Sequence, residues 1–165
     1  MWLLNRRTFL LGAVALGGAS ACGFTPVYGP KGEARALLNA VAVDPPRDRE
    51  GYLLVRHIEE RLGRATAPTY GLSIAIKLDQ ERMAITDDNI AARFNLLGKA
   101  TYALRDLSTG EVVTTGIVES FTGYSTTGST AATQAASRNA SERLMTILGD
   151  KVITRLMSAK LSSGT

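Results

Sequence analysis

The feature that most constrains the fold of this chain is a strict alternation of apolar residues with polar or small ones over residues 70–79. Successive side chains of an extended strand point to opposite faces, so this alternation places one apolar set on one side of a sheet. The apolar set comprises Tyr70, Leu72, Ile74, Ile76 and Leu78. Residues 92–104 repeat the pattern, with Phe94, Leu96, Ala100, Tyr102 and Leu104 pointing inward. Two such segments predict a sheet that buries one face and leaves the other free.

Two other segments show helical periodicity. After Asp48, a predicted N-cap, apolar residues recur at every fourth position as far as Leu62, and Gly63 is expected to end this helix. A second, longer helix is predicted from about Ala131. Its apolar stripe comprises Ala136, Ala140, Leu144, Ile147, Leu148, Val152 and Leu156. Gly149, inside this helix, indicates a bend or a close approach of another segment.

The remaining segments complete the predicted fold. A first strand is expected over Leu37–Val43, and a last strand over residues 111–121, followed by a Gly-, Ser- and Thr-rich loop over residues 122–130. The order is then β-α-β-β-β-α. We predict an α+β, two-layer sandwich in which a four-stranded, mostly antiparallel sheet carries both helices on one face.

Composition limits the chemistry that is open to the chain. With 165 residues, 45% of them hydrophobic and 21% charged, it has room for one small domain. One cysteine and one histidine cannot supply a zinc site, so we expect no metal. Neither a phosphate-binding Gly-x-x-x-x-Gly-Lys-Ser/Thr loop nor a Gly-x-Ser-x-Gly elbow occurs. We therefore expect no catalytic residues and no enzymatic activity, and we interpret His57 as a solvated or helix-packing side chain.

The first 22 residues are built like an export signal. Arg6 and Arg7 precede an apolar stretch, Phe9–Leu16, which is shorter than the ~20 residues of a membrane-spanning helix. Small residues at 17–21 then lead to Cys22 in a pattern that resembles a bacterial lipobox. We predict a diacylglycerol and an N-acyl lipid on Cys22 as the only attached groups. The alternative is an ordinary Ala-x-Ala cleavage site followed by a free thiol.

The same region also indicates how the chain is exported and to which membrane it is sorted. Residues 5–11 resemble a twin-arginine signal, and Sec export is equally compatible with them. Gly23 after the cysteine favours sorting to the outer membrane, on its periplasmic side.

Without Arg6 and Arg7, 17 basic residues remain against 15 acidic ones, and this excess is too weak to predict nucleic-acid binding. The predicted organisation is a signal peptide at 1–21, a lipidated tether at 22–35, one domain at 36–161 and a tail at 162–165.

The free face of the predicted sheet is small, polar and basic. It would display Ser73, Ala75, Lys77 and Asp79 from one strand and Arg93, Asn95, Leu97, Lys99, Thr101 and Arg105 from the next. One interpretation is an ordinary solvated sheet face. The other is that four cations form a stripe that binds phosphate or carboxylate groups, as in lipopolysaccharide. These cations are Lys77, Arg93, Lys99 and Arg105.

Three segments together resemble a known family. Residues 21–29, Ala-Cys-Gly-Phe-Thr-Pro-Val-Tyr-Gly, are similar to its Cys-Gly-Phe-x-Pro-Leu-Tyr opening. Residues 91–96, Ala-Ala-Arg-Phe-Asn-Leu, match the start of one of its strands, and residues 136–143 look like its Ala-Glu-x-Asp-Ala-x-x-Arg helix. Ser125 and Asn139 depart from the family pattern. The family is that of the LPS-assembly lipoprotein LptE, in its alphaproteobacterial branch.

This resemblance implies a function as well as a fold. Members of the family plug the lumen of the outer-membrane β-barrel translocon LptD, help it to assemble, and contact lipopolysaccharide on its way to the outer leaflet. The expected partners are therefore an LptD-type barrel, lipopolysaccharide and, through the lipid anchor, the membrane. An auxiliary lipoprotein of an ABC-type lipid transporter, with the same anchor and general architecture, is the alternative.

Overall fold

A computed structural model describes residues 34–85, 91–126 and 128–159 of the chain. The predicted signal peptide, Cys22, the tether as far as residue 33 and the C-terminal tail lie outside the described residues. The described elements, in chain order, are α2 (Ala34–Leu37), β1 (Val41–Val43), α3 (Arg49–Leu62), β2 (Tyr70–Ile85), β3 (Ala91–Asp106), β4 (Val112–Ser125) and α4 (Thr130–Ser158).

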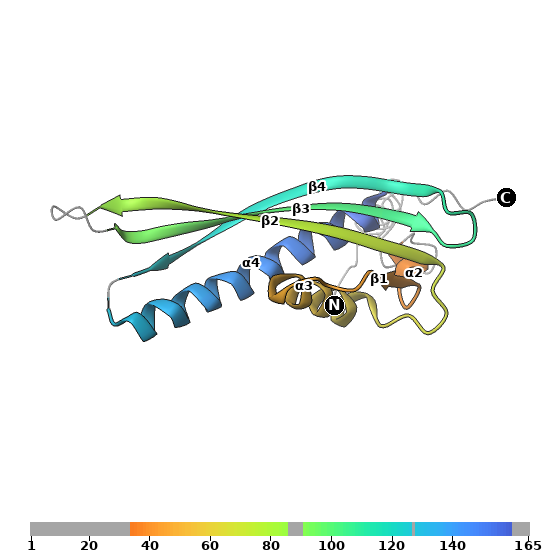
Figure 1. Cartoon of the computed structure of the whole chain (residues 1–165). Helices are drawn as coiled ribbons and strands as arrows, with labels where there is room; N and C mark the ends of the chain where they lie inside the picture. Colours follow the sequence, from red (N-terminus) through yellow and green to blue (C-terminus); the bar gives the residue numbers. More distant parts are fainter. Residues whose placement is uncertain (1–33, 86–90, 127, 160–165) are drawn as a thin grey trace, which may run out of the picture.

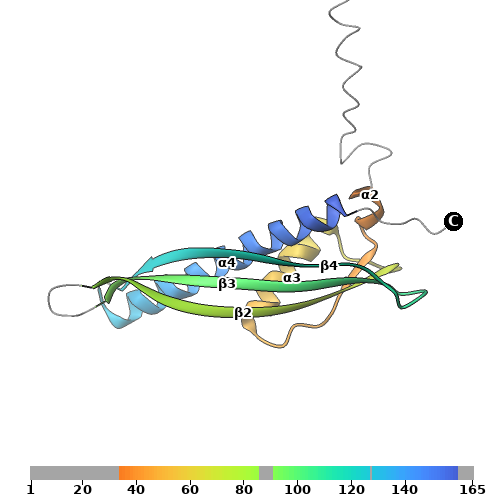
Figure 2. The ribbon, with the colours of Figure 1, turned by 90° about the horizontal axis from the view of Figure 1, so that it is seen from above.

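These elements form two layers (Figure 1). The sheet has the strand order β1-β2-β3-β4, with β1 parallel to β2 and the other neighbours antiparallel. Both long helices, α3 and α4, lie on the same side of it, and α4 crosses the sheet obliquely (Figures 1 and 2). The predicted α+β layout, with a mostly antiparallel four-stranded sheet and two helices on one face, is confirmed.

The strand register brings the predicted apolar sets together. Leu72 lies opposite Leu104, and Ile76 lies opposite Ala100. The core between sheet and helices contains fully buried side chains from both layers, among them Leu54, Ile58, Leu62, Leu72, Leu104, Leu144, Leu148, Val152 and Leu156. Burial of such side chains is the main favourable term in folding, at about 1.5–3 kcal/mol for each.

Both ends of α3 lie where the sequence predicts them. The Asp48 carboxylate caps α3 by accepting a 2.7 Å hydrogen bond from the Gly51 backbone N–H. Gly63 ends the helix with φ at +81°, a conformation that favours glycine. Gly149 is a point of close approach: a Cβ there would lie 2.7 Å from Cδ2 of His57. His57 therefore packs between α3 and α4, where its Nε2 lies 2.9 Å from Oδ1 of Asp150.

Two predicted boundaries were wrong. Leu37, the predicted start of the first strand, ends the short helix α2, and β1 begins only at Val41. Between them Asn39 has φ at +58°, which interrupts any extended run, and a short apolar segment does not reveal its own periodicity. Residues 122–125, predicted as loop, continue β4. Pairing with β3 extends the strand there, and the Tyr124 ring stacks on Phe94 with centroids 5.8 Å apart.

We predict that Gly116→Ala destabilises the fold through a steric clash. Gly116 faces the ring of Tyr102, and an added Cβ would lie 2.5 Å from its hydroxyl oxygen and 2.7 Å from Cζ. Tyr102 is only 5% exposed, so its ring has little room to move away. The free energy of unfolding should fall by about 1–3 kcal/mol, as for other overpacked cores. Urea denaturation measures the change.

Gly123→Ala is the matched control on the same strand. A Cβ there meets nothing closer than Asn95 Oδ1 at 3.3 Å, so this variant should be near neutral. Equal losses of stability at both glycines would show that Tyr102 is not the cause.

We also predict that Asp106 makes stability depend on pH. Its Oδ1 accepts hydrogen bonds from the Ser108 hydroxyl and backbone N–H and from the Thr109 N–H, and these lower the pKa of the Asp106 carboxyl. A carboxyl whose pKa is lower in the folded state stabilises fully above its unfolded pKa of about 3.9. This contribution is lost as the pH falls through the folded-state pKa. Thermal unfolding should therefore show a gap in Tm between the unmodified chain and Asp106→Ala that narrows from pH 6 to pH 3; a constant gap would contradict the prediction.

Candidate functional site

The candidate site lies on the outer face of the sheet, the side turned away from α3 and α4 (Figure 1). None of the described helices covers this face. Strand register arranges its side chains in rows across β2, β3 and β4. Three central rows are Ala75–Thr101–Ile117, Lys77–Lys99–Glu119 and Asp79–Leu97–Phe121.

The charged row brings two cations face to face. Lys77 and Lys99 are direct cross-strand partners, an arrangement in which like charges repel. Each is balanced by a carboxylate: Lys77 Nζ lies 3.2 Å from Asp79 Oδ2, and Lys99 Nζ lies 3.0 Å from Glu119 Oε1. Exposed ion pairs of this kind contribute little stability, about 0–1 kcal/mol. Both ammonium groups can therefore turn towards the anionic oxygens of a ligand at small cost.

A third lysine approaches the same place from the helix layer. Lys151 of α4 reaches the edge of β4 and donates a 2.7 Å hydrogen bond to the Glu119 carbonyl oxygen. The three lysines, with Leu97 and Phe121, line a shallow hollow of about 480 Å³. Such a hollow offers cations and apolar surface side by side.

The apolar part of this face was missed by the sequence analysis. Ile117 is 53% exposed and Phe121 is 65% exposed, and both come from β4. From the sequence, only residues of two strands were assigned to the free face, which was therefore predicted to be small, polar and basic. Odd-numbered positions of residues 115–125 follow the same period of two and could have identified both side chains.

The four predicted cations do not lie together. Lys77 and Lys99 are neighbours, whereas Arg93 and Arg105 each lie six residues along β3 from Lys99, a separation of ~20 Å. Arg105 is held by Asp44, with Nη2 2.6 Å from Oδ1 and Nη1 3.1 Å from Oδ2. This hydrogen-bonded pair raises the pKa of Arg105 further above its usual value. Arg105 therefore holds the segment after β1 against the sheet. Anion binding by Lys77, Arg93 and Lys99 stays a prediction.

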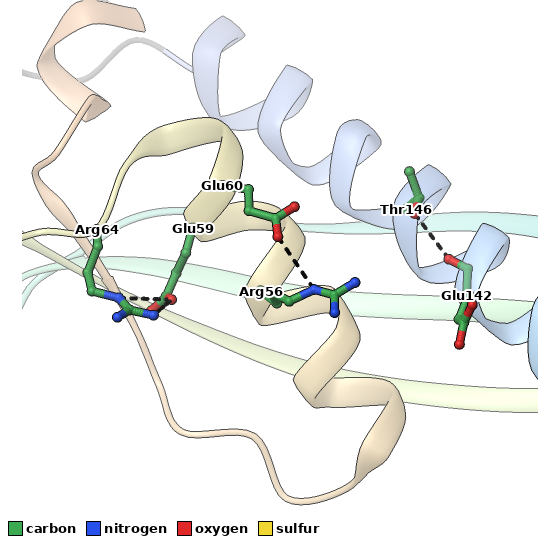
Figure 3. A network of polar contacts seen from close by, with 6 residues as sticks. All are labelled: Arg56, Glu59, Glu60, Arg64, Glu142 and Thr146. Carbon is green, nitrogen blue, oxygen red and sulfur yellow. Dashed lines mark hydrogen bonds and ion pairs between the residues drawn. The ribbon is translucent and has the colours of Figure 1, made fainter.

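The helix layer presents a different surface. Its charges pair with one another: Arg56 with Glu60 at 3.5 Å and Arg64 with Glu59 at 2.8 Å (Figure 3). Tyr52, 57% exposed, is the largest exposed apolar side chain that this layer contributes within the described chain. The outer sheet face is thus where exposed apolar groups and cations meet.

Two other kinds of feature, a metal-binding cluster and a membrane-spanning helix, are absent from the described residues. Within residues 34–85, 91–126 and 128–159, no three His, Cys, Asp or Glu side chains are grouped so that they could hold a metal ion. No helix in these ranges combines the length and apolar character needed to cross a bilayer.

The chain shares its fold with several solved lipoproteins. No protein-family model and no curated protein matches the sequence. A candidate lipoprotein from Caulobacter crescentus CB15 has 22% sequence identity and a TM-score of 0.63, covering 76% of this chain and 93% of that one. The rare lipoprotein B from Shewanella oneidensis has 10% identity and a TM-score of 0.56, covering 72% and 92%. A minor lipoprotein from Acinetobacter baumannii has 9% identity and a TM-score of 0.55, covering 76% and 94%. At these identities the similarity establishes the fold alone.

Proposed function

We propose that this chain is a non-enzymatic, lipid-anchored lipoprotein of the outer membrane that plugs an LptD-type β-barrel, helps it to assemble and takes part in inserting lipopolysaccharide into the outer leaflet. The observation that carries the proposal is the outer sheet face, on which Ile117 and Phe121 stand exposed beside Lys77 and Lys99. The fold shared with solved lipoproteins and the predicted lipid on Cys22 support it.

The mixed character of the outer face suits an enclosed surface. Exposed aromatic and aliphatic groups that lie close together, rimmed by charged residues, are typical of protein interfaces. The lumen of a large transmembrane barrel is polar, so a plug needs many polar and charged side chains with a few apolar contacts among them. The rows around Thr101, Lys99 and Leu97 present this mixture.

The hollow beside Lys99 supports a role in contacting lipopolysaccharide. Lipid A combines phosphate groups with acyl chains. Ammonium groups bind phosphate through charge-assisted hydrogen bonds, and apolar side chains shelter hydrocarbon from water. Lys77, Lys99 and Lys151 supply the cations, and Leu97 and Phe121 supply the apolar surface.

We expect the full chain, affinity-tagged and extracted in mild detergent, to bring down a large outer-membrane barrel. Changing both Ile117→Asp and Phe121→Asp should lower the yield of barrel at least tenfold, because two charges then face the interface. Tm should stay close to that of the unmodified chain, since both side chains are exposed.

Tyr52→Asp is the matched control, because it removes an equally exposed aromatic from the helix layer. It should leave the yield of barrel unchanged. Recovery of the lipoprotein alone in several mild detergents would overturn the proposal. Recovery of an inner-membrane permease instead would support the ABC-transporter alternative.

We further expect Lys77→Glu combined with Lys99→Glu to weaken binding of fluorescent lipopolysaccharide at least tenfold. The change replaces two adjacent cations with two anions at the hollow. The control pair Arg56→Glu and Arg61→Glu makes the same change in net charge on α3, and it should have a much smaller effect. Equal losses with both pairs would mean that overall charge, not this site, governs binding.

A further inference from the structure

The two edges of the sheet differ in whether their outward backbone groups are hydrogen-bonded. At the β4 edge, side chains of α4 occupy outward-pointing carbonyl groups: Lys151 Nζ donates to Glu119 O at 2.7 Å, and Arg143 Nη2 donates to Gly123 O at 3.2 Å. Occupied backbone groups cannot pair with another strand. At these two positions the β4 edge is therefore protected against strand addition.

The β2 edge is open along most of its length. β1 pairs with Tyr70–Leu72 only, and the last hydrogen bond on this side runs from the Asp44 N–H to the Leu72 carbonyl oxygen at 2.8 Å. Alternate residues of an edge strand direct their backbone groups outward, so those of Ile74, Ile76 and Leu78 point the same way as those of Leu72. No described residue hydrogen-bonds to these outward groups. A row of free donors and acceptors is complementary to one kind of ligand, an extended peptide backbone.

A groove of about 530 Å³ runs beside this open edge. Its inner side is apolar, lined by Leu54 and Val55 of α3 and by Ile74 and Ile76 of β2. The segment 44–48, with Asp44, Arg47 and Asp48, and the positions Ser73 and Ala75 of β2 also line it. Asp44 in that segment is bound by Arg105 and Asp48 caps α3, whereas Arg47 has no ion-pair partner among the described residues. A strand placed here would meet apolar walls on one face and polar groups on the other.

We propose that the open β2 edge binds, by strand addition, an extended segment of the partner barrel whose side chains alternate between apolar and polar. The identity of this partner rests on the proposed function. Transmembrane strands of a barrel alternate with a period of two, which matches the two sides of the groove. The edge would hold such a strand in extended form before the barrel closes, which is how a plug could also assist assembly.

The geometry favours a single extended segment of a partner over two other occupants, a second copy of this chain and the N-terminal part of the chain itself. A second copy would bring its own segment 44–48 and its own α3, both beside its β2, into the same groove. The N-terminal part of this chain joins the domain through α2, which lies at the C-terminal end of α4 and not along the open part of β2 (Figure 2). A single strand from a partner brings no such bulk into the groove and is not attached to the domain at a distant point.

Peptide binding to the full chain in detergent tests the edge directly. The probe is a fluorescent nine-residue peptide in which Val alternates with Glu and Thr. Two control peptides carry backbone N-methyl groups, one on the Val residues and one on the others, so that each blocks one edge of the peptide. We expect one control to bind like the parent and the other to bind at least tenfold more weakly, which also reports strand direction. No binding of the parent, or equal binding of the two controls, would overturn the proposal.

Photo-cross-linking in cells identifies the occupant. A photoreactive amino acid at Arg47, an exposed residue that lines the groove and lies outside the outer sheet face, should give an adduct with the barrel. The same amino acid at Thr66, exposed in the turn before β2, should give none. An adduct of two copies of the chain would overturn the assignment of the partner. If the barrel co-purifies but Arg47 forms no adduct, strand addition fails and the proposed function stands. If edge-selective peptide binding occurs but no barrel co-purifies, the assigned partner and the proposed function fail.

Discussion

The long antiparallel pairing of β2 with β3 is the constraint on which the rest of the structure depends. It runs from Tyr70 opposite Asp106 to the bulge beyond Arg82. On the core face, between Leu72 and Leu78, it places each apolar side chain of β2 beside an apolar or small residue of β3. A shift of one residue would exchange the two faces of a strand. The same register that buries Leu72 against Leu104 therefore sets Lys77 against Lys99 on the outer face. Core and candidate site are two consequences of one pairing.

Charged side chains are arranged differently on the helix layer and on the outer sheet face. On the helices, charged groups pair locally, as Arg56 does with Glu60, and the large exposed apolar side chains of the described helices are Tyr52 and Ile147. On the outer sheet face, cations and carboxylates alternate with Ile117 and Phe121. α4 takes part in both arrangements, since its inner side fills the core while Lys151 and Arg143 reach round to the β4 edge. The sheet is thus closed on one face and one edge, and open on the other face and the other edge.

Much of the fold could be predicted because its signals are local. Period-two alternation identified β2 and β3, and the four-residue repeat after Asp48 identified α3 with both of its ends. The errors occurred where local signals are weak. Leu37 lies in a short apolar run that fits helix or strand, and residues 122–125 are extended because β3 lies beside them. The candidate site was only half visible: Lys77 and Lys99 were identified, but not their pairing or the apolar residues beside them.

The sequence by itself determined which residues can be buried, where α3 begins and ends, and that no recognised catalytic or zinc-binding pattern is present, because each of these depends on residue type and spacing along the chain. Only the tertiary structure decided which cations are neighbours, that Arg105 is committed to Asp44, and that one sheet edge is capped while the other is open. Those features depend on strand register and on how far β1 and α4 extend across the sheet. Register and reach follow from the packing of the whole chain, which no short window of sequence contains.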